Sequence, residues 1–313
     1  MPFTAKSGKF NASINAVEFG TGDKAVKIGG ENVFPLYSFD AAIENAPKVG
    51  IEITDFGMEH EPECIKKYYG GCATLADMAR KAASMEGVDF LSFRMEGGDP
   101  NGANKSTEEL IGELKEIADA VDLPLVVCGC KNVEKDAELF SKAAEALNGK
   151  NAVILSAKEE NYKTVGAAAG LAYKQVVGAE SAVDINLAKQ LNVLISQLGV
   201  DSKSVVMNVG SAAVGYGFEY VISTMDRVKA AALQQGDANL QMPIITPVAS
   251  EAWGVKEAMA SETDAPEWGS QEERGIDMEV ETAMAVIAAG SNAVILKHPE
   301  SIKTISGLMK ELV

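Results

Sequence analysis

Polar residues with hydrogen-bonding side chains gather in the stretch from Val88 to Asn104, after an apolar and β-rich run. Four of them are carboxylates or carboxamides, separated by glycines and one proline: Glu96, Asp99, Asn101 and Asn104. Such groups accept or donate hydrogen bonds, and glycine permits the backbone angles of an exposed turn. Ser106 and Glu109 have the spacing of a capping box, which predicts the start of a helix. The stretch therefore predicts a strand, a polar loop and a helix, and we expect the loop on the rim of a functional site.

Polar residues also follow the other apolar runs, in chemically mixed groups. The groups are Thr54 to Gly57, Cys130 to Asn132, Lys158 to Asn161, Asn208 to Ser211, Thr246 to Glu251, and Lys297 to Pro299. Each has a structural alternative, since Asp55 can cap a helix, Asn208 can close a turn and Lys297 can pair with a carboxylate. His298 is a candidate general base, although a bond to a neighbouring loop is the commoner role of such a histidine.

The cysteines do not have the spacing of a metal site or of a disulfide framework. There are four: Cys64, Cys72, Cys128 and Cys130. The last two are one residue short of a Cys-x-x-Cys pair, and strand alternation predicts that both thiols face the same packed side. Only two histidines, His60 and His298, are present. We therefore expect no iron–sulfur cluster or other metal centre built by this chain alone.

The composition disfavours two classes of partner. Against 28 Lys and Arg stand 45 Asp and Glu, and the formal charge of −17 repels nucleic-acid phosphates and anionic lipid. No apolar run approaches the ~20 residues that cross a bilayer. The first residues lack the apolar centre of a signal peptide. We expect a cytoplasmic protein that binds neither nucleic acid nor membrane.

A repeating unit of apolar strand, polar loop, alanine-rich helix and glycine must position these polar groups. The strands expected are Val49 to Thr54, Asp89 to Met95, Leu123 to Gly129, Ala152 to Ala157, Ser204 to Val209, Met242 to Val248 and Ala293 to Lys297. The helices expected are Leu75 to Met85, Thr107 to Ala120, Glu134 to Leu147, Ile185 to Leu198, Glu219 to Leu233 and Gln271 to Ala289. An eighth strand near Gln175 to Gly178 is less clear, because the segment before it is small and alanine-rich.

Eight strands that alternate with helices predict an α/β fold, a (β/α)8 TIM barrel, whose functional groups lie at the carboxyl ends of the strands. A doubly wound open sheet is the alternative, but Gly70-Gly71 does not have the form of a dinucleotide fingerprint. Residues 1–48 differ in pattern, and Thr21-Gly22-Asp23 between two β-like runs predicts a hairpin. We expect an N-terminal β-hairpin extension over residues 1–48 that packs on a barrel of residues 49–313.

The loop from Ala249 to Ser270 is the longest and holds both tryptophans, Trp253 and Trp268. Long insertions at a barrel mouth serve as lids or interfaces, and aromatic side chains anchor interfaces with little loss of entropy. We expect contact with a partner protein or a large ring. The alternative is that the two rings hold the loop on its own barrel.

Four segments carry a resemblance to a known family: Y-Y-G-G-C-A-T-L-A-D-M-A-R, D-F-L-S-F-R-M-E-G-G-D-P-N, L-P-L-V-V-C-G-C and M-P-I-I-T-P-V-A-S-E-A-W. With the chain length, they resemble the small subunit of the corrinoid iron–sulfur protein, the delta subunit of the CO dehydrogenase/acetyl-CoA synthase system. The resemblance implies a heterodimer with a large subunit that carries a [4Fe-4S] cluster and a cobamide. It implies that the pair moves a methyl group from methyltetrahydrofolate, through a methyltransferase, to acetyl-CoA synthase in the reductive acetyl-CoA pathway.

The resemblance favours a non-catalytic subunit whose barrel mouth covers the corrinoid. No short catalytic motif of that family can be mapped onto this chain residue by residue. The candidate corrinoid contacts therefore rest on strand-end position alone: Met95, Asp99, Asn101, Asn208, Ser211 and Thr246. One alternative is a free-standing pterin-dependent methyltransferase barrel, in which Asp99 and Asn208 bind the pterin. Another is an aldolase with Lys158 or Lys297 as Schiff-base nucleophile.

Overall fold

Eight parallel strands close into a barrel in the computed structural model, which describes residues 8–313. The strands are β3 (Lys48–Thr54), β4 (Phe90–Arg94), β5 (Leu125–Cys128), β6 (Val153–Ala157), β7 (Val176–Glu180), β8 (Val205–Asn208), β9 (Ile244–Pro247) and β10 (Ser291–Leu296). Each pairs with the next in sequence, and β10 closes the ring by pairing with both β9 and β3. The predicted TIM barrel is confirmed, and the less clear eighth strand is present as β7.

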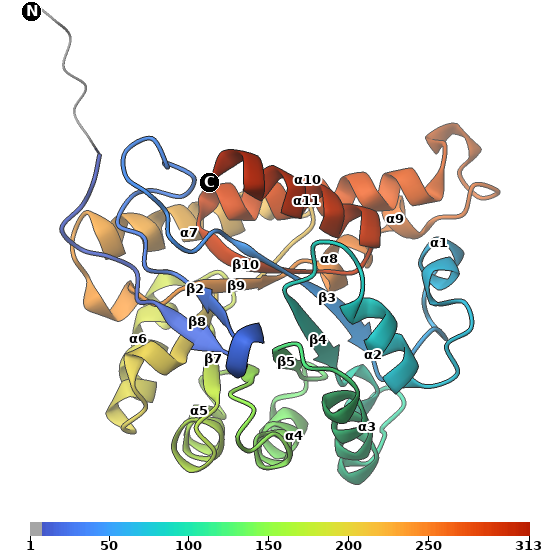
Figure 1. Ribbon diagram of the computed structural model, residues 1–313, viewed down its shortest axis with the longest axis horizontal. Helices are drawn as coiled ribbons and strands as arrows, with labels where there is room; N and C mark the ends of the chain where they lie inside the picture. The colour runs from blue at the N-terminus through green and yellow to red at the C-terminus, as the bar shows by residue number, and fades with distance from the viewer. Residues whose placement is uncertain (1–7) are drawn as a thin grey trace, which may run out of the picture.

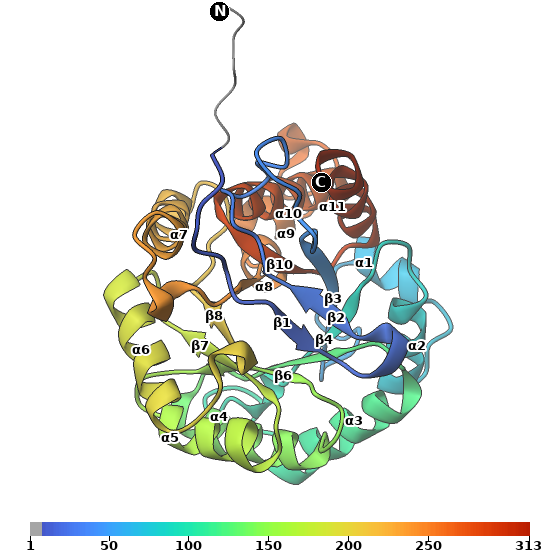
Figure 2. The same cartoon turned by 60° about the vertical axis from the view of Figure 1, so that its left-hand side comes forward.

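Helices form an outer ring around the barrel (Figures 1 and 2). The longer ones are α2 (Leu75–Ala83), α3 (Thr107–Ala120), α4 (Val133–Ala146), α6 (Ile185–Gln197), α7 (Phe218–Leu233), α10 (Gln271–Ala289) and α11 (Pro299–Leu312). The predicted starts are explained by capping, because the hydroxyls of Ser106 and Ser270 accept from the backbone N–H groups of Glu109 and Glu273. Gly87, Gly149 and Gly290, predicted to stop helices, have positive φ.

Short elements fill the connections. They are α1 (Glu63–Lys66), α5 (Tyr162–Val165), α8 (Ala249–Ala252) and α9 (Lys256–Met259), the 3-10 turns η1 (Gly22–Lys24), η2 (Lys67–Tyr69), η3 (Glu96–Gly98), η5 (Ser202–Ser204), η6 (Ala238–Leu240) and η7 (Pro266–Trp268), and the π-helical segment η4 (Gly166–Ala172). The alanine-rich stretch before β7, which gives little periodic signal in the sequence, is thus α5 followed by η4. Within the described residues, no helix is both long and apolar enough to cross a membrane.

A two-stranded antiparallel hairpin, β1 (Val17–Phe19) and β2 (Val26–Ile28), lies across one end of the barrel (Figure 2). Val17, Phe19, Val26 and Ile28 are buried in one cluster with residues that point into the barrel. The ring of Phe19 meets Phe90, the first residue of β4, edge to face at 5.5 Å. Because strands begin at this end, the hairpin covers the amino-terminal end and leaves the opposite end, where the strands finish, for a site.

Candidate functional site

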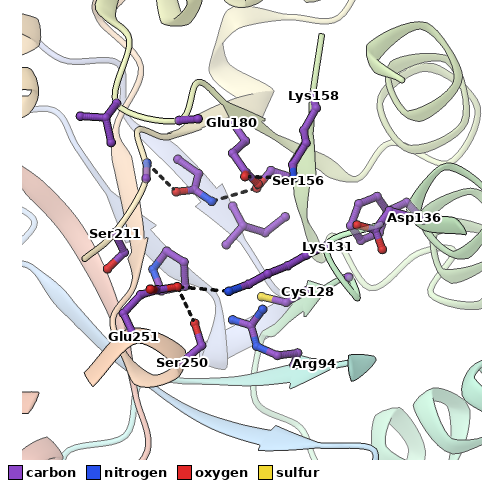
Figure 3. A pocket seen from close by; sticks show the side chains of 18 residues that line it. Arg94, Cys128, Lys131, Asp136, Ser156, Lys158, Glu180, Ser211, Ser250 and Glu251 are labelled. Atoms are coloured by element: carbon purple, nitrogen blue, oxygen red, sulfur yellow. Dashed lines mark hydrogen bonds and ion pairs between the residues drawn. The ribbon is translucent and has the colours of Figure 1, made fainter. Parts of the chain in front are cut away.

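A cavity of about 290 Å³ opens at the carboxyl ends of the strands (Figure 3). Its wall comes from β4 to β9, the loops after them, and the helices α4 and α8: Arg94, Cys128, Gly129, Lys131, Asp136, Phe140, Leu155, Ser156, Lys158, Glu180, Ala182, Val183, Asn208, Gly210, Ser211, Pro247, Ser250 and Glu251. This is the end at which TIM barrels place their sites. The polar lining can hold a ligand by hydrogen bonds as well as by charge.

A buried ion pair borders this cavity through Arg94. The Nε of Arg94 donates to Oε2 of Glu52 at 2.9 Å, and both side chains are almost fully buried. Its Nη2 lies 2.8 Å from the same oxygen but is not aligned as a hydrogen-bond donor to any described acceptor. Burial opposes the charge of Arg94, yet the carboxylate of Glu52 outweighs it and raises the pKa of the guanidinium. Arg94 therefore stays charged, with donor capacity left over at the cavity.

One wall of the cavity is a chain of hydrogen bonds across β6, β7 and β8. Asn208 donates from Nδ2 to Ser156 Oγ at 3.1 Å, and Ser156 donates to Glu180 Oε2 at 3.2 Å. Lys158 pairs with the other oxygen of Glu180 at 3.3 Å. The Asn208 Oδ1 accepts from the backbone N–H of Gly210 at 3.1 Å, which fixes the amide. This wall is preorganised because each group orients the next.

An ion pair spans the cavity entrance. Lys131, after β5, lies 3.2 Å from Glu251, which is in α8 just after β9. These two strands are four positions apart in either direction around the ring, so the pair crosses the mouth along a diameter (Figure 3). The side chains of Lys131 and Glu251 are 66% and 34% exposed, so the attraction is screened by water and worth at most ~1 kcal/mol. The bridge can open at little cost to admit a ligand.

The cysteine pair does not face one side, and that prediction is wrong. Cys128 points into the barrel, where its thiol lies 3.5 Å from Ser92 Oγ, whereas Cys130 packs in the outer core. The physical reason is that β5 ends at Cys128, so strand alternation does not extend to Cys130. The thiol and the backbone N–H of Cys130 donate instead to Asp136 at 3.2 and 2.7 Å. Burial raises the pKa of both thiols, that of Cys130 to about 12, so neither is a nucleophile near neutral pH.

Two of the six residues selected from sequence line the cavity, Asn208 and Ser211. The hydroxyl of Ser211 is buried without a hydrogen-bond partner in the described residues. The other four lie outside the cavity wall. Their role as corrinoid contacts stays a prediction.

These four are placed elsewhere for identifiable reasons. Met95 is fully buried in the outer core. Thr246 alternates along β9 with Ile245 and Pro247, so its side chain turns outward from the barrel, and its hydroxyl lies 2.8 Å from that of Ser291. Asp99 accepts from the backbone N–H of Asn101 at 2.9 Å, which is an Asx turn, the structural role open to it in the sequence.

Strand-end reasoning overlooked Arg94, Glu52 and Glu180. A signal for two of them exists in the sequence, because Glu52 and Arg94 are charged residues inside otherwise apolar strands. A charge in such a place needs a partner or a function. Glu180 gave no such signal because the strand β7 was only weakly indicated.

The loop from Ala249 to Ser270 folds back on its own barrel through Trp253. That ring is 6% exposed and stacks on His298 at 5.8 Å, which supports the self-contact alternative for this tryptophan. Trp268 lies nearer the surface, with Lys256 and Arg274 over its ring at 5.2 and 5.8 Å. Only Trp268 therefore remains accessible for a partner.

His298 has a structural role at the start of α11. Its Nδ1 accepts from the backbone N–H of Glu300 at 3.2 Å, and burial lowers the pKa of the imidazole. Glu279, fully buried, accepts from the backbone N–H groups of Lys297 and His298 at 2.6 and 3.1 Å. Burial raises the pKa of Glu279 to about 7. This carboxyl group thus anchors the end of β10 beside Trp253.

Neither lysine proposed as a Schiff-base nucleophile has the required environment. Lys297 lies 2.7 Å from Glu61; burial opposes its charge, but that carboxylate raises the pKa of the ammonium. Lys158 is held by Glu180. A nucleophilic lysine needs a lowered pKa, which is the opposite of the shift at Lys297, and the amine of Lys158 is occupied by a carboxylate, so the site does not favour aldolase chemistry. Among residues 8–313, no group of three or more His, Cys, Asp and Glu side chains could hold a metal ion.

Solved structures with the same architecture are dihydropteroate synthases. The enzyme from Thermus thermophilus in complex with 4-aminobenzoate covers 95% of this chain and 100% of its own, with a TM-score of 0.56 and 12% identity. That from Vibrio fischeri has a TM-score of 0.56 and 11% identity, over 95% of this chain and 98% of its own. At such identity, the likeness concerns the fold alone.

Sequence relatives are subunits of one complex. The acetyl-CoA decarbonylase/synthase complex subunit delta of Methanothermobacter thermautotrophicus is 31% identical over 299 residues, which are 95% of this chain and 75% of the relative. That of Methanopyrus kandleri is 33% identical over 293 residues, or 93% and 71%. Delta 1 of Methanosarcina thermophila is 29% identical over 300 residues, or 94% and 67%. The family model for the CO dehydrogenase/acetyl-CoA synthase delta subunit matches residues 16–306, and the chain belongs to this family, as its sequence segments indicated.

Proposed function

We propose that this chain is the small subunit of a heterodimeric corrinoid iron–sulfur protein and has no catalytic role of its own. In this proposal the mouth of the barrel covers a corrinoid held mainly by the large subunit. The pair carries a methyl group from methyltetrahydrofolate, delivered by a methyltransferase, to acetyl-CoA synthase in the cytoplasm. The [4Fe-4S] cluster belongs to the large subunit. The observation that carries the proposal is the membership of residues 16–306 in the delta-subunit family, together with an open polar cavity at the mouth.

The dimensions of the cavity fit a covering role rather than a full binding pocket. Its volume of about 290 Å³ is at the low end of the ~300–1,000 Å³ of small-molecule sites. A corrin ring with its side arms is much larger, so only an edge or one arm can enter. The ring itself must be held by another surface, which agrees with a cofactor shared between two subunits.

The residues of the mouth fit the chemistry of a corrinoid edge, because corrinoids carry neutral carboxamide arms. The buried hydroxyl of Ser211 and the Nη2 of Arg94 have no hydrogen-bond partner in the described chain, and Asn208 is already oriented. Ser211 and Arg94 would donate to such an edge, and the barrel would keep water from the covered face. When bound, the corrinoid supplies the cobalt–carbon chemistry of methyl transfer.

The structural likeness to dihydropteroate synthases gives little support to the alternative of a pterin-dependent methyltransferase. One of those enzymes was solved with 7,8-dihydropteroate, but it shares 13% identity with this chain. The two residues expected to bind a pterin together are separated, since Asn208 lines the cavity and Asp99 does not. Asp99 is instead occupied by its own turn.

Reconstitution tests the proposal. The chain is purified alone and with a corrinoid-loaded large subunit, and the corrinoid absorbance is followed through gel filtration. We expect a one-to-one complex that carries the corrinoid, and a chain that alone neither retains it nor demethylates methyltetrahydrofolate. Methyl transfer by the isolated chain would favour the methyltransferase alternative, and failure to form the complex would contradict the proposal.

A further inference from the structure

The cavity is built to receive a ligand group of a defined kind, because one of its buried polar atoms lacks a partner. The Ser211 hydroxyl is buried and makes no hydrogen bond within the described residues, whereas the buried Arg94 Nη2 lies 2.8 Å from the Glu52 carboxylate without the alignment of a hydrogen bond. An unpaired buried polar group costs ~1–3 kcal/mol, and such groups are rare unless a ligand or water completes them. The space beside them, about 290 Å³, far exceeds the ~10–15 Å³ that one water needs. The site can therefore take more than a single water.

The charges of the cavity select against a free anion. Its three cationic side chains each have a carboxylate partner: Arg94 with Glu52, Lys131 with Glu251 and Lys158 with Glu180. A further carboxyl group, Asp136, lines the wall and accepts from Cys130 rather than from a described cation. Burial raises the pKa of Asp136. No cationic side chain of the described wall is left over for a phosphate or a carboxylate.

The free hydrogen-bonding capacity of the wall is of both kinds. Ser211 and Arg94 can donate, while Asp136 and Glu251 each have one carboxylate oxygen engaged and offer the other. A neutral group that carries a carbonyl oxygen and an N–H side by side satisfies both kinds, whereas a hydrocarbon satisfies neither. The amide group has this arrangement.

We infer that this cavity binds a neutral amide. Two sources share this chemistry. One is a peripheral carboxamide arm of the corrinoid on the partner, and the other is the amino-lactam edge of a pterin such as tetrahydrofolate. For the corrinoid source, the inference rests on the proposed function. It adds that the barrel mouth recognises one functional group of the corrinoid as well as covering it.

The test compares amides with acids. The large subunit is loaded with an intact corrinoid, or with derivatives in which one peripheral carboxamide at a time is hydrolysed to a carboxylate. The Kd of the full chain for each complex is measured by calorimetry, and tetrahydrofolate is titrated separately into the chain alone. Ser211→Ala removes an unpaired donor at the wall, and Ser196→Ala, on the exposed surface of α6, is the matched control.

We expect one hydrolysed derivative to bind at least tenfold more weakly than the intact corrinoid, and Ser211→Ala to reduce that difference while Ser196→Ala leaves it unchanged. Saturable binding of tetrahydrofolate, weakened by Ser211→Ala, would assign the same site to the pterin source. Equal affinity for every derivative together with no tetrahydrofolate binding would overturn the inference. A complex that still forms with all derivatives would leave the proposed covering role intact, so the two failures are distinguishable.

Discussion

Replacing Glu279 with Gln should change the way in which stability depends on pH. The pKa of this buried carboxyl group is raised from 4.5 to about 7 by burial, despite two backbone N–H donors. A group whose pKa is higher in the folded state stabilises the fold fully below its unfolded pKa. That contribution is lost as the pH rises through the folded pKa. Wild-type protein should therefore lose stability between mildly acidic and alkaline pH because Glu279 ionises in an apolar place.

The size of this effect follows from the shift. A rise from 4.5 to about 7 corresponds to about 3 kcal/mol in total, at ~1.36 kcal/mol per pKa unit. Part of this is already lost at pH 5.5, so about 2 kcal/mol remains to be lost between pH 5.5 and 8.5. Gln cannot ionise and so lacks this loss. Its amide will also face one of the two backbone N–H groups, which lowers stability by an amount that does not depend on pH.

Urea unfolding at pH 5.5, 7.0 and 8.5 checks the prediction. The difference in unfolding free energy between Glu279→Gln and wild type should move in favour of the variant by about 2 kcal/mol across this range. Glu281→Gln, an exposed change on the same helix, controls for net charge. A difference that is constant with pH would refute the reasoning and would mean that Glu279 is ionised throughout.

Three further outcomes are expected. The double variant Asp99→Ala, Asn101→Ala should change the unfolding free energy by about 0.5 kcal/mol or less, because an exposed Asx turn contributes little to core packing. Unchanged methyl exchange in the complex would show that this loop is structural. If the partner contacts the long loop, the fluorescence change on assembly should vanish in Trp268→Phe. It should persist in Trp253→Phe, because the ring of Trp253 is buried. The reverse pattern would place the contact elsewhere. Cys128→Ala should lower stability by about 1 kcal/mol and leave methyl transfer intact, and loss of activity at unchanged stability would show that the thiol takes part.

The sequence predicts the barrel well because each unit carries its own signals. The helix α3 spans Thr107–Ala120, as expected from Ser106 and from the apolar period, and the hairpin lies where Thr21 to Asp23 indicate. Element ends were less certain. The strand β5 stops at Cys128, two residues before the apolar run gives out, and this misplaced the thiol of Cys130.

The site was predictable only in part, since strand ends show which loops meet but not which side chains point inward. Asn208 and Ser211 follow β8 and do line the cavity, whereas Thr246, on an equivalent strand, turns outward by alternation. The pairing of Lys131 with Glu251 joins residues 120 positions apart, which no local pattern reveals.

The central claim is that the barrel mouth covers a corrinoid held by the large subunit, and the accessibility of the cobalt tests it most directly. The rate at which cyanide binds the corrinoid is measured on the loaded large subunit alone, on its complex with this chain, and on its complex with the Ser211→Trp variant. The added tryptophan is intended to fill the mouth, and Ser196→Trp on the surface of α6 is the control. The claim predicts that the wild-type chain and Ser196→Trp slow cyanide binding at least tenfold, while folded Ser211→Trp fails to do so. An equal rate with and without the wild-type chain, in a complex shown to be assembled, would contradict it.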